Sequence, residues 1–237
     1  AFAAIRRDGS VVTWGSSRGG DSRGVQDQLQ NVKAIQSTAG AFAAILGNGK
    51  VVTWGDPQVG GDSTDVSDYL TEIQELQSTD SAFAALRADQ SVVTWGNLSH
   101  GGDSSAVQEQ LKHVEKIQRN YYAFASILMD GSVVTWGDPL CGGDSSQVRD
   151  QLQDVQCIQA TRSAFAALTK KGTVVTWGNP SAGGDSTSVT HQLQNVVQLH
   201  ATWYAFVALT SSGSVVTWGN QPSGGQSNQV QHLFPLV

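Results

Sequence analysis

Six near-copies of one motif, a strand–turn–strand pattern within each copy and a glycine-rich loop between copies predict an all-β fold. The expected architecture is a β-propeller of six repeats, with three to four strands and a short helical turn in each blade. The motif runs from "AFA" or a close variant to "VVTWG", and the copies begin at residues 1, 41, 82, 123, 164 and 205. Because such small units cannot bury a core alone, we expect a single repeat domain over residues 1–237.

The second copy illustrates the two central strands. The segment "AFAAI", residues 41–45, is apolar on both alternating faces, which is typical of a strand that is covered on both sides. Asn48-Gly49 supplies the positive φ that a two-residue hairpin turn favours. The following "KVVTWG", residues 50–55, is rich in β-branched residues and predicts the second strand. We expect its tryptophan to be a structural core residue in every copy, namely Trp14, Trp54, Trp95, Trp136, Trp177 and Trp218.

A polar loop and a third strand complete the copy. The loop "DPQVGGDS", residues 56–63, interrupts the sheet, and Asp62 or Ser63 is a candidate cap for a short helix. The spacing of Val66, Leu70 and Ile73 predicts about two helical turns. The segment "IQELQST", residues 73–79, then predicts a third strand that leads into the next copy.

The spacing of these positions resembles the repeat of the regulator of chromosome condensation family. The residues that carry the resemblance are Val32, Ile35, Thr38, Ala41, Phe42, Ala44, Ile45, Asn48, Gly49, Val51, Trp54 and Gly55. The resemblance implies a β-propeller, which has seven blades in that family. This chain has six shorter copies, carries "GGDS" in place of the family's "GQLG", and reaches Val237 before its last third strand, so we expect an incomplete propeller or part of a longer one.

Composition restricts the partners. A formal charge of -6 with only 14% charged residues disfavours a polyanion, so we expect no nucleic-acid partner. No apolar run is long enough to predict insertion into a membrane. Cys141 and Cys157 lie in one copy and have no counterpart in the others, which predicts free thiols rather than a disulfide framework. Free thiols favour an intracellular location, cytoplasmic or nuclear, or an organelle if a targeting sequence is missing.

The repeated polar residues do not form a catalytic set. The "GGDS" loops supply one carboxylate per copy, whereas calcium takes six to eight oxygen ligands, so we expect these carboxylates to cap or close turns. They are Asp21, Asp62, Asp103, Asp144 and Asp185, with Gln226 in the sixth copy. The histidines lack metal-ligand spacing and are expected to be isolated surface residues: His100, His113, His191, His200 and His232. We therefore expect no enzymatic activity, no metal and no cofactor.

The residues that differ between copies are the candidates for recognition. The two positions before each "AFA" vary, and variable loops on a rigid scaffold often carry binding residues. The tentative partner-binding residues are Tyr121, Tyr122, Trp203, Tyr204, Arg119 and Arg162. A competing interpretation is that these aromatic side chains fill the space near the propeller axis and bind nothing.

The leading functional hypothesis is a non-enzymatic protein-interaction scaffold or an accessory subunit of a larger assembly, whose protein partner the sequence does not identify. One alternative is a sugar-binding propeller lectin with one pocket per blade. The resemblance implies another alternative, because the family includes nucleotide-exchange factors for a small GTPase and adaptor regions of ubiquitin ligases.

Overall fold

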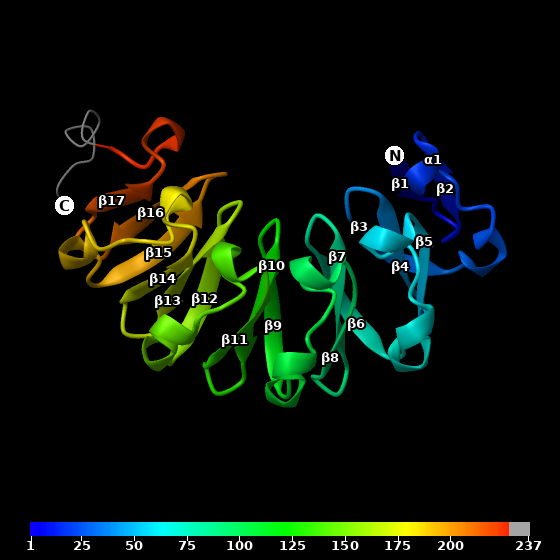
Figure 1. Ribbon diagram of the computed structural model, residues 1–237, viewed down its shortest axis with the longest axis horizontal. Helices are drawn as coiled ribbons and strands as arrows, with labels where there is room; N and C mark the ends of the chain where they lie inside the picture. The colour runs from blue at the N-terminus through cyan, green and yellow to red at the C-terminus, as the bar shows by residue number, and fades with distance from the viewer. Residues whose placement is uncertain (228–237) are drawn as a thin grey trace. The chain divides into compact units, whose positions relative to one another are not determined.

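The computed structural model describes residues 1–227, which contain five three-stranded antiparallel sheets and one two-stranded sheet. The strands are β1 Phe2–Ile5, β2 Val11–Trp14, β3 Val32–Ser37, β4 Ala41–Leu46, β5 Val51–Gly55, β6 Ile73–Ser78, β7 Ala82–Arg87, β8 Val92–Gly96, β9 Val114–Arg119, β10 Ala123–Leu128, β11 Val133–Gly137, β12 Val155–Ala160, β13 Ala164–Thr169, β14 Val174–Gly178, β15 Val196–Ala201, β16 Ala205–Thr210 and β17 Val215–Gly219. The predicted all-β repeat architecture is thus confirmed, with one sheet per copy (Figure 1).

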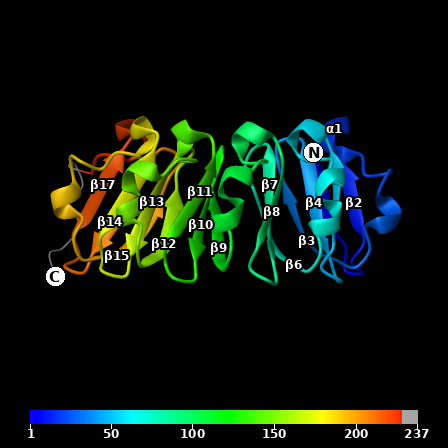
Figure 2. The ribbon, with the colours of Figure 1, turned by 60° about the horizontal axis from the view of Figure 1, so that its bottom comes forward.

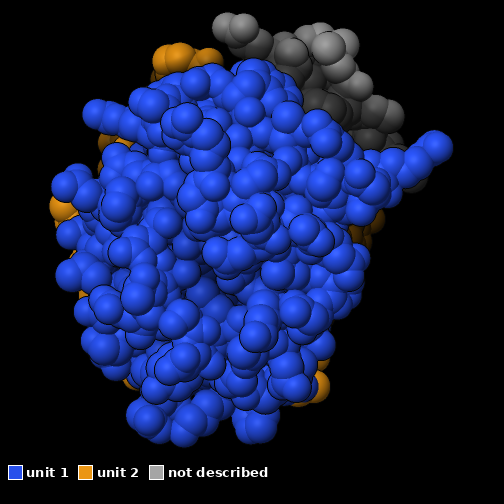
Figure 3. Space-filling model, turned by 90° about the vertical axis from the view of Figure 1, so that its right-hand side faces the viewer, with its two compact units in different colours: residues 1–117 blue, residues 118–237 orange. Residues whose placement is uncertain are grey.

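The chain divides into two compact units, residues 1–117 and 118–237, which Figure 3 draws in different colours. Unit 1 contains the sheets β1-β2, β3-β4-β5 and β6-β7-β8. Unit 2 contains the sheets β12-β13-β14 and β15-β16-β17, together with β10 and β11, while the division itself falls within β9. The expectation of a single repeat domain over residues 1–237 stays a prediction.

Each sheet takes its first strand from the end of the preceding copy. The segment predicted as a third strand, β6 for example, pairs with the "AFA" strand of the next copy, so Ser78 lies opposite Phe83. The first sheet contains only β1 and β2. The "AFAAI" strand is central in each complete sheet, which explains its apolar character on both faces.

The hydrophobic core lies between successive sheets within each unit. In unit 1, Ala43 and Ile45 of β4 share a cluster with Phe83 and Trp95 of the next sheet. In unit 2 the sheets β12-β13-β14 and β15-β16-β17 follow one another as layers (Figure 2). Between these sheets lies a hydrophobic cluster that contains Ala166 of β13 and Phe206 of β16. Alanines on the central strand allow this close approach, and one Phe per copy fills the remaining space.

The hairpin turns differ from the predicted two-residue form. In the second copy Ile45 pairs with Val51, and the Leu46 amide donates to the Lys50 carbonyl oxygen at 2.8 Å, which leaves a three-residue loop. Only its last residue, Gly49, has a positive φ, at 77°. A three-residue hairpin loop requires that conformation only at its final position. The copy that lacks glycine still adopts it, since Gln90 has a φ of 66°.

The predicted helical segment has about the expected two turns but is of a different type. Residues Thr64–Tyr69 form a 3₁₀ helix, and Ile73, which was expected to extend the helical stripe, begins β6 instead. The Ser63 side chain does not cap this helix, whereas Asp62 Oδ1 accepts from the Thr64 amide at 2.9 Å. A 3₁₀ helix suits so short a connection because its tighter turn needs few residues.

Short helices occupy the loops of every copy. The one α-helix in residues 1–227 is α1, Ser17–Gly20. The 3₁₀ helices are Gln26–Gln28, Pro57–Val59, Thr64–Tyr69, Leu98–His100, Ser105–Gln110, Pro139–Cys141, Ser146–Gln151, Pro180–Ala182, Thr190–Gln192 and Gln221–Ser223. None of these helices is long and apolar enough to cross a membrane.

Candidate functional site

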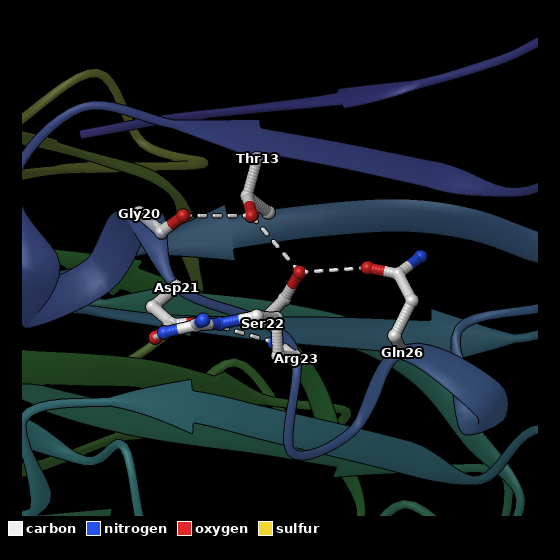
Figure 4. Close-up of polar contacts among 6 residues, drawn as sticks. All are labelled: Thr13, Gly20, Asp21, Ser22, Arg23 and Gln26. Atoms are coloured by element: carbon white, nitrogen blue, oxygen red, sulfur yellow. Dashed lines mark hydrogen bonds and ion pairs between the residues drawn. The ribbon is translucent and has the colours of Figure 1, made fainter.

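The repeated "T" of "VVTWG" and the repeated "S" of "GGDS" meet in every copy. In the first copy the hydroxyls of Thr13 and Ser22 lie 2.9 Å apart, and Thr13 also donates to the Gly20 carbonyl oxygen (Figure 4). The Ser22 hydroxyl donates to Gln26 Oε1 at 2.9 Å. The same hydroxyl pair recurs at 2.9 to 3.1 Å as Thr53–Ser63, Thr94–Ser104, Thr135–Ser145, Thr176–Ser186 and Thr217–Ser227. These polar residues therefore tie the loop to the sheet.

The loop carboxylates close turns, as predicted. Asp103 Oδ1 accepts from the Ser105 amide at 2.8 Å, and this bond together with the Ser105 side chain lowers the pKa of Asp103. Asp21 is bonded to the Arg23 side chain and amide, and these bonds lower its pKa to about 2. Within residues 1–227 no three His, Cys, Asp or Glu side chains form a group that could hold a metal ion.

The repeated tryptophans are buried in five copies but not in the first. Trp54, Trp95, Trp136, Trp177 and Trp218 are all buried core residues. Trp14 is 51% exposed, so its assignment to the structural core was wrong. The buried rings are covered by the loop of the preceding copy, as when Trp95 Nε1 donates to the Gly60 carbonyl oxygen at 3.0 Å.

Backbone hydrogen bonds between neighbouring blades of unit 2 place three of the predicted residues in a row. The Tyr121 amide donates to the Arg162 carbonyl oxygen at 3.1 Å, and the Arg162 amide donates to the Trp203 carbonyl oxygen at 2.8 Å. These residues occupy the same position in successive copies, 41 residues apart. The two aromatic pairs therefore lie together within unit 2, with Arg162 between them.

Arg162 is the centre of this group. Its Nη1 donates to the Tyr204 hydroxyl at 3.1 Å and its Nη2 to the Tyr122 hydroxyl at 2.8 Å. These two bonds, that of Tyr204 first, raise the pKa of Arg162 above its ordinary value. The guanidinium carbon also lies 4.8 Å from the centroid of the Tyr121 ring, close enough for a cation–π interaction. Tyr122 and Tyr204 therefore orient Arg162, which the sequence analysis named as a tentative partner-binding residue but did not place at the centre of the group.

Trp203 and Arg119 form the exposed part of the group. The Trp203 ring is 58% exposed and lies 6.1 Å, between centroids, from that of Tyr121. Arg119, at the end of β9, is exposed. Both line an open hollow of about 270 Å³. Its lining comprises Arg119, Asn120, Tyr121, Ala160, Thr161, Arg162, Thr202 and Trp203. We refer to Arg119, Tyr121, Tyr122, Arg162, Trp203 and Tyr204 as the arginine–aromatic cluster.

Asn120 is a further residue of this hollow that the sequence analysis missed. Its Oδ1 accepts from the Ala123 amide at 2.8 Å, and its Nδ2 donates to the Cys141 carbonyl oxygen at 2.6 Å. Thr161 performs the same task in the next copy through one hydroxyl, which bonds the backbone of Ala164 and Ala182. The signal was available, because Asn120 is the single departure from Thr at this position: Thr38, Thr79, Asn120, Thr161 and Thr202.

The histidines and thiols mostly match their predictions. His113, His191 and His200 are exposed, but His100 is partly buried, and its Nδ1 lies 2.6 Å from the Ser81 hydroxyl. The expectation of an isolated surface side chain was therefore wrong for His100, while His232 lies outside the described residues. Ser81 is itself buried, so this pair does not offer an accessible nucleophile.

Neither Cys141 nor Cys157 forms a disulfide, in agreement with the sequence analysis. Cys141 is buried, and burial followed by the nearby Asp138 raises its pKa to about 11. At neutral pH Cys141 is consequently a thiol, which is a poor nucleophile.

No family model and no curated protein matches this chain. The chain is similar in structure to yeast RCC1 (Prp20) solved with Kap60, at 17% identity and a TM-score of 0.52, over 81% of this chain and 56% of that one. It is similar to the ectodomain of the Physcomitrella patens receptor kinase CR4, at 17% identity and a TM-score of 0.54, over 92% of this chain and 60% of that one. The chain therefore spans less than two thirds of either protein.

A second structure, of Prp20p from Saccharomyces cerevisiae, matches at 17% identity and a TM-score of 0.52, over 81% of this chain and 58% of that one. These likenesses establish the fold. The chain has the RCC-type repeat β-propeller architecture that the sequence resemblance implied.

Proposed function

We propose that this chain is a non-enzymatic protein-interaction propeller and that the arginine–aromatic cluster is its partner-binding surface. The observation that carries the proposal is Trp203, a large ring that is 58% exposed beside the exposed Arg119. Tryptophan and arginine are the residue types that contribute most to protein–protein binding energy. The other tryptophans of unit 2 are buried, so Trp203 differs from them in both position and environment.

The clustering of the surrounding side chains also supports this role. Tyr121 packs edge-on against Tyr122 at 5.3 Å between centroids, and Tyr204 lies 6.5 Å from Trp203. Because these rings and Arg162 hold one another in place, little side-chain entropy remains to be lost when a partner covers them. The solved yeast RCC1 (Prp20) is bound to Kap60 in one structure, but because fold alone does not define function, the proposal rests on the cluster itself.

A sugar-binding function receives less support. One pocket per blade would require equivalent exposed aromatic residues in each copy, whereas the repeated tryptophan is buried in five of the six copies. The aromatic residues of the cluster occur in two copies only. We expect no set of equal binding sites on a glycan array.

The test compares two exposed apolar side chains of unit 2 by affinity capture from a native extract. Trp203→Ser removes the candidate anchor, whereas Met129→Ser changes a side chain of similar exposure, 62%, at the opposite end of β10 from Tyr122. We expect the partners captured by the wild type to be lost with Trp203→Ser and kept with Met129→Ser. Loss of an interface anchor of this type reduces affinity by about 2 kcal/mol or more, roughly thirtyfold.

Tyr122 is a poor choice for this test. Because its hydroxyl accepts from Arg162, Tyr122→Ser would disturb the guanidinium as well as the surface. Melting curves of Trp203→Ser should match the wild type, since the ring is mostly exposed. Equal capture by the wild type and Trp203→Ser would contradict the proposed surface.

A further inference from the structure

We propose that the hollow of the arginine–aromatic cluster binds a carboxylate side chain of an acidic peptide segment, with a neighbouring apolar residue of the peptide on Trp203. This inference rests on the proposed function and adds the chemistry of the ligand. It follows from which hydrogen-bonding groups of the hollow are already used and which are left over.

Three neutral polar side chains of the hollow are already used. Asn120 bonds the backbone of Ala123 and Cys141 through its two amide atoms. The hydroxyls of Thr161 and Thr202 each donate to backbone carbonyl oxygens and accept a backbone amide. None of these three side chains is therefore available to a ligand without loss of a structural hydrogen bond.

Three groups of the hollow are donors without a hydrogen-bond partner among the described residues. In the described part of the chain, the Arg119 guanidinium and the Trp203 indole N–H make no hydrogen bond, although both side chains are exposed. The Nε of Arg162, which also lines the hollow, is buried and has no hydrogen-bond partner in residues 1–227. A carboxylate accepts hydrogen bonds and cannot donate them, so it is complementary to this set.

The charge of the hollow also favours a carboxylate ligand. Two other arginines in residues 1–227 form ion pairs, Arg23 with Asp21 at 2.6 Å and Arg87 with Asp89 at 2.8 Å. No carboxylate of the described residues lies within ion-pair distance of Arg119 or Arg162. Two uncompensated guanidinium groups on a chain with a formal charge of -6 therefore mark a local positive site. Such a site favours an anionic partner and disfavours a cationic one.

The volume of the hollow fits a side chain rather than a folded surface. About 270 Å³ accommodates one carboxylate group with an adjacent side chain, and the exposed face of Trp203 borders that space. An apolar side chain next to the acidic residue can pack on this ring. The recognised element is consequently a short segment with an acidic residue beside an apolar one.

The experiment uses fluorescently labelled peptides and fluorescence anisotropy with the full chain. The probe set is an array of twelve-residue peptides with degenerate flanks and a fixed central Glu-Leu, together with matched arrays in which Gln, Lys or phosphoserine replaces Glu. We expect the Glu array to yield binding peptides. Replacing Glu by Gln in those peptides should weaken binding about tenfold, because a charge-assisted hydrogen bond is lost.

The matched protein variants are Arg119→Gln and Lys171→Gln. Both remove one exposed positive charge from unit 2, but Lys171 lies at the hairpin between β13 and β14 and does not line the hollow. We expect Arg119→Gln to weaken the Glu peptides about tenfold and Lys171→Gln to leave them unchanged. Binding of the Glu peptides should also weaken as salt rises.

Three outcomes would overturn the carboxylate proposal. They are Gln peptides that bind as tightly as Glu peptides, a preference for Lys or phosphoserine peptides, and binding that is equal in wild type and Arg119→Gln. If native partners are still lost with Trp203→Ser in any of these cases, the protein-binding surface stands and only the ligand chemistry fails. If Trp203→Ser has no effect on native partners, the proposed function fails as well.

Discussion

The first and third sheets of unit 1 share two strands of nearly the same sequence, yet the tryptophans of these strands are in different environments. Phe2 stacks on Trp14 at 5.4 Å and Phe83 on Trp95 at 5.1 Å, so the pairing within each sheet is the same. Trp14 is nevertheless 51% exposed, whereas Trp95 is 4% exposed. The difference arises because the loop of the preceding copy covers Trp95 through Gly60.

This comparison shows that the core of the repeat belongs to pairs of blades and not to single blades. A copy supplies its own Phe–Trp pair, but burial of that pair depends on the loop of its neighbour. Stability in such proteins is approximately a sum of repeat and nearest-neighbour terms. Equivalent substitutions in the first and third sheets should therefore separate the stability of the repeat itself from that of its interface with the neighbouring repeat.

The largest difference is expected between Trp95→Ala and Trp14→Ala. Trp95→Ala removes a buried ring and its hydrogen bond to Gly60, which should reduce the free energy of unfolding by about 3–5 kcal/mol. Trp14→Ala removes a ring that is half exposed and should cost less than about 1.5 kcal/mol. Denaturant unfolding of the two variants measures both values, and equal losses would contradict the neighbour-dependent core.

A smaller difference is expected at the second glycine of each loop pair. A Cβ at Gly61 would lie 2.4 Å from the Gly55 carbonyl carbon, whereas one at Gly20 would lie 2.9 Å from its nearest atom, the Trp14 carbonyl carbon. Both contacts are with backbone, which cannot move aside like a side chain. Gly61→Ala should therefore cost about 1–3 kcal/mol and Gly20→Ala less.

Gly24 provides the control for these glycine variants. A Cβ at this position meets nothing within 4 Å, so Gly24→Ala should leave the melting temperature within about 2 °C of the wild type. Thermal unfolding followed by circular dichroism is sufficient for the comparison. A loss at Gly24 as large as that at Gly61 would show that the close backbone approach is not the reason for the repeated glycine pair.

The repeat was predictable from the sequence because its signals are local. The alternation in "AFAAI" and the β-branched run in "VVTWG" identified the strands, and the loop glycines marked the breaks between them. The exposure of Trp14 was not predictable from its own copy, since that copy has the same "VVTWG" as the others. The helical interpretation of Ile73 failed because an i, i+3 spacing across a loop mimics a helical stripe.

The candidate site was predictable only in part. Variation between copies identified the aromatic pairs, but the central position of Arg162 depends on two hydroxyls from copies on either side of it. Residues 41 positions apart become neighbours only when the blades stack, and no local pattern encodes that contact. Aligning the copies and comparing equivalent positions would have found Asn120, whereas the central position of Arg162 appears only in the structure.

The smallest expected effect is a change in the pKa of one loop carboxylate. Here too the first copy, with Asp21, differs from a later copy, with Asp103. The folded pKa values of Asp21 and Asp103 both lie below the ordinary value of 3.8, so their contribution to stability is present above pH 3.8 and is lost as the pH falls through the folded values. For Asp21 the first cause is the Arg23 side chain, whereas for Asp103 it is the Ser105 amide. Arg23→Gln should thus raise the pKa of Asp21 from about 2 toward 3.8 and leave that of Asp103 unchanged. A carboxyl-carbon NMR titration measures both groups in one sample. If Arg23→Gln leaves the pKa of Asp21 in place, the ion pair of the first copy does not form in solution, and its loop is then held by the same backbone hydrogen bond as the others.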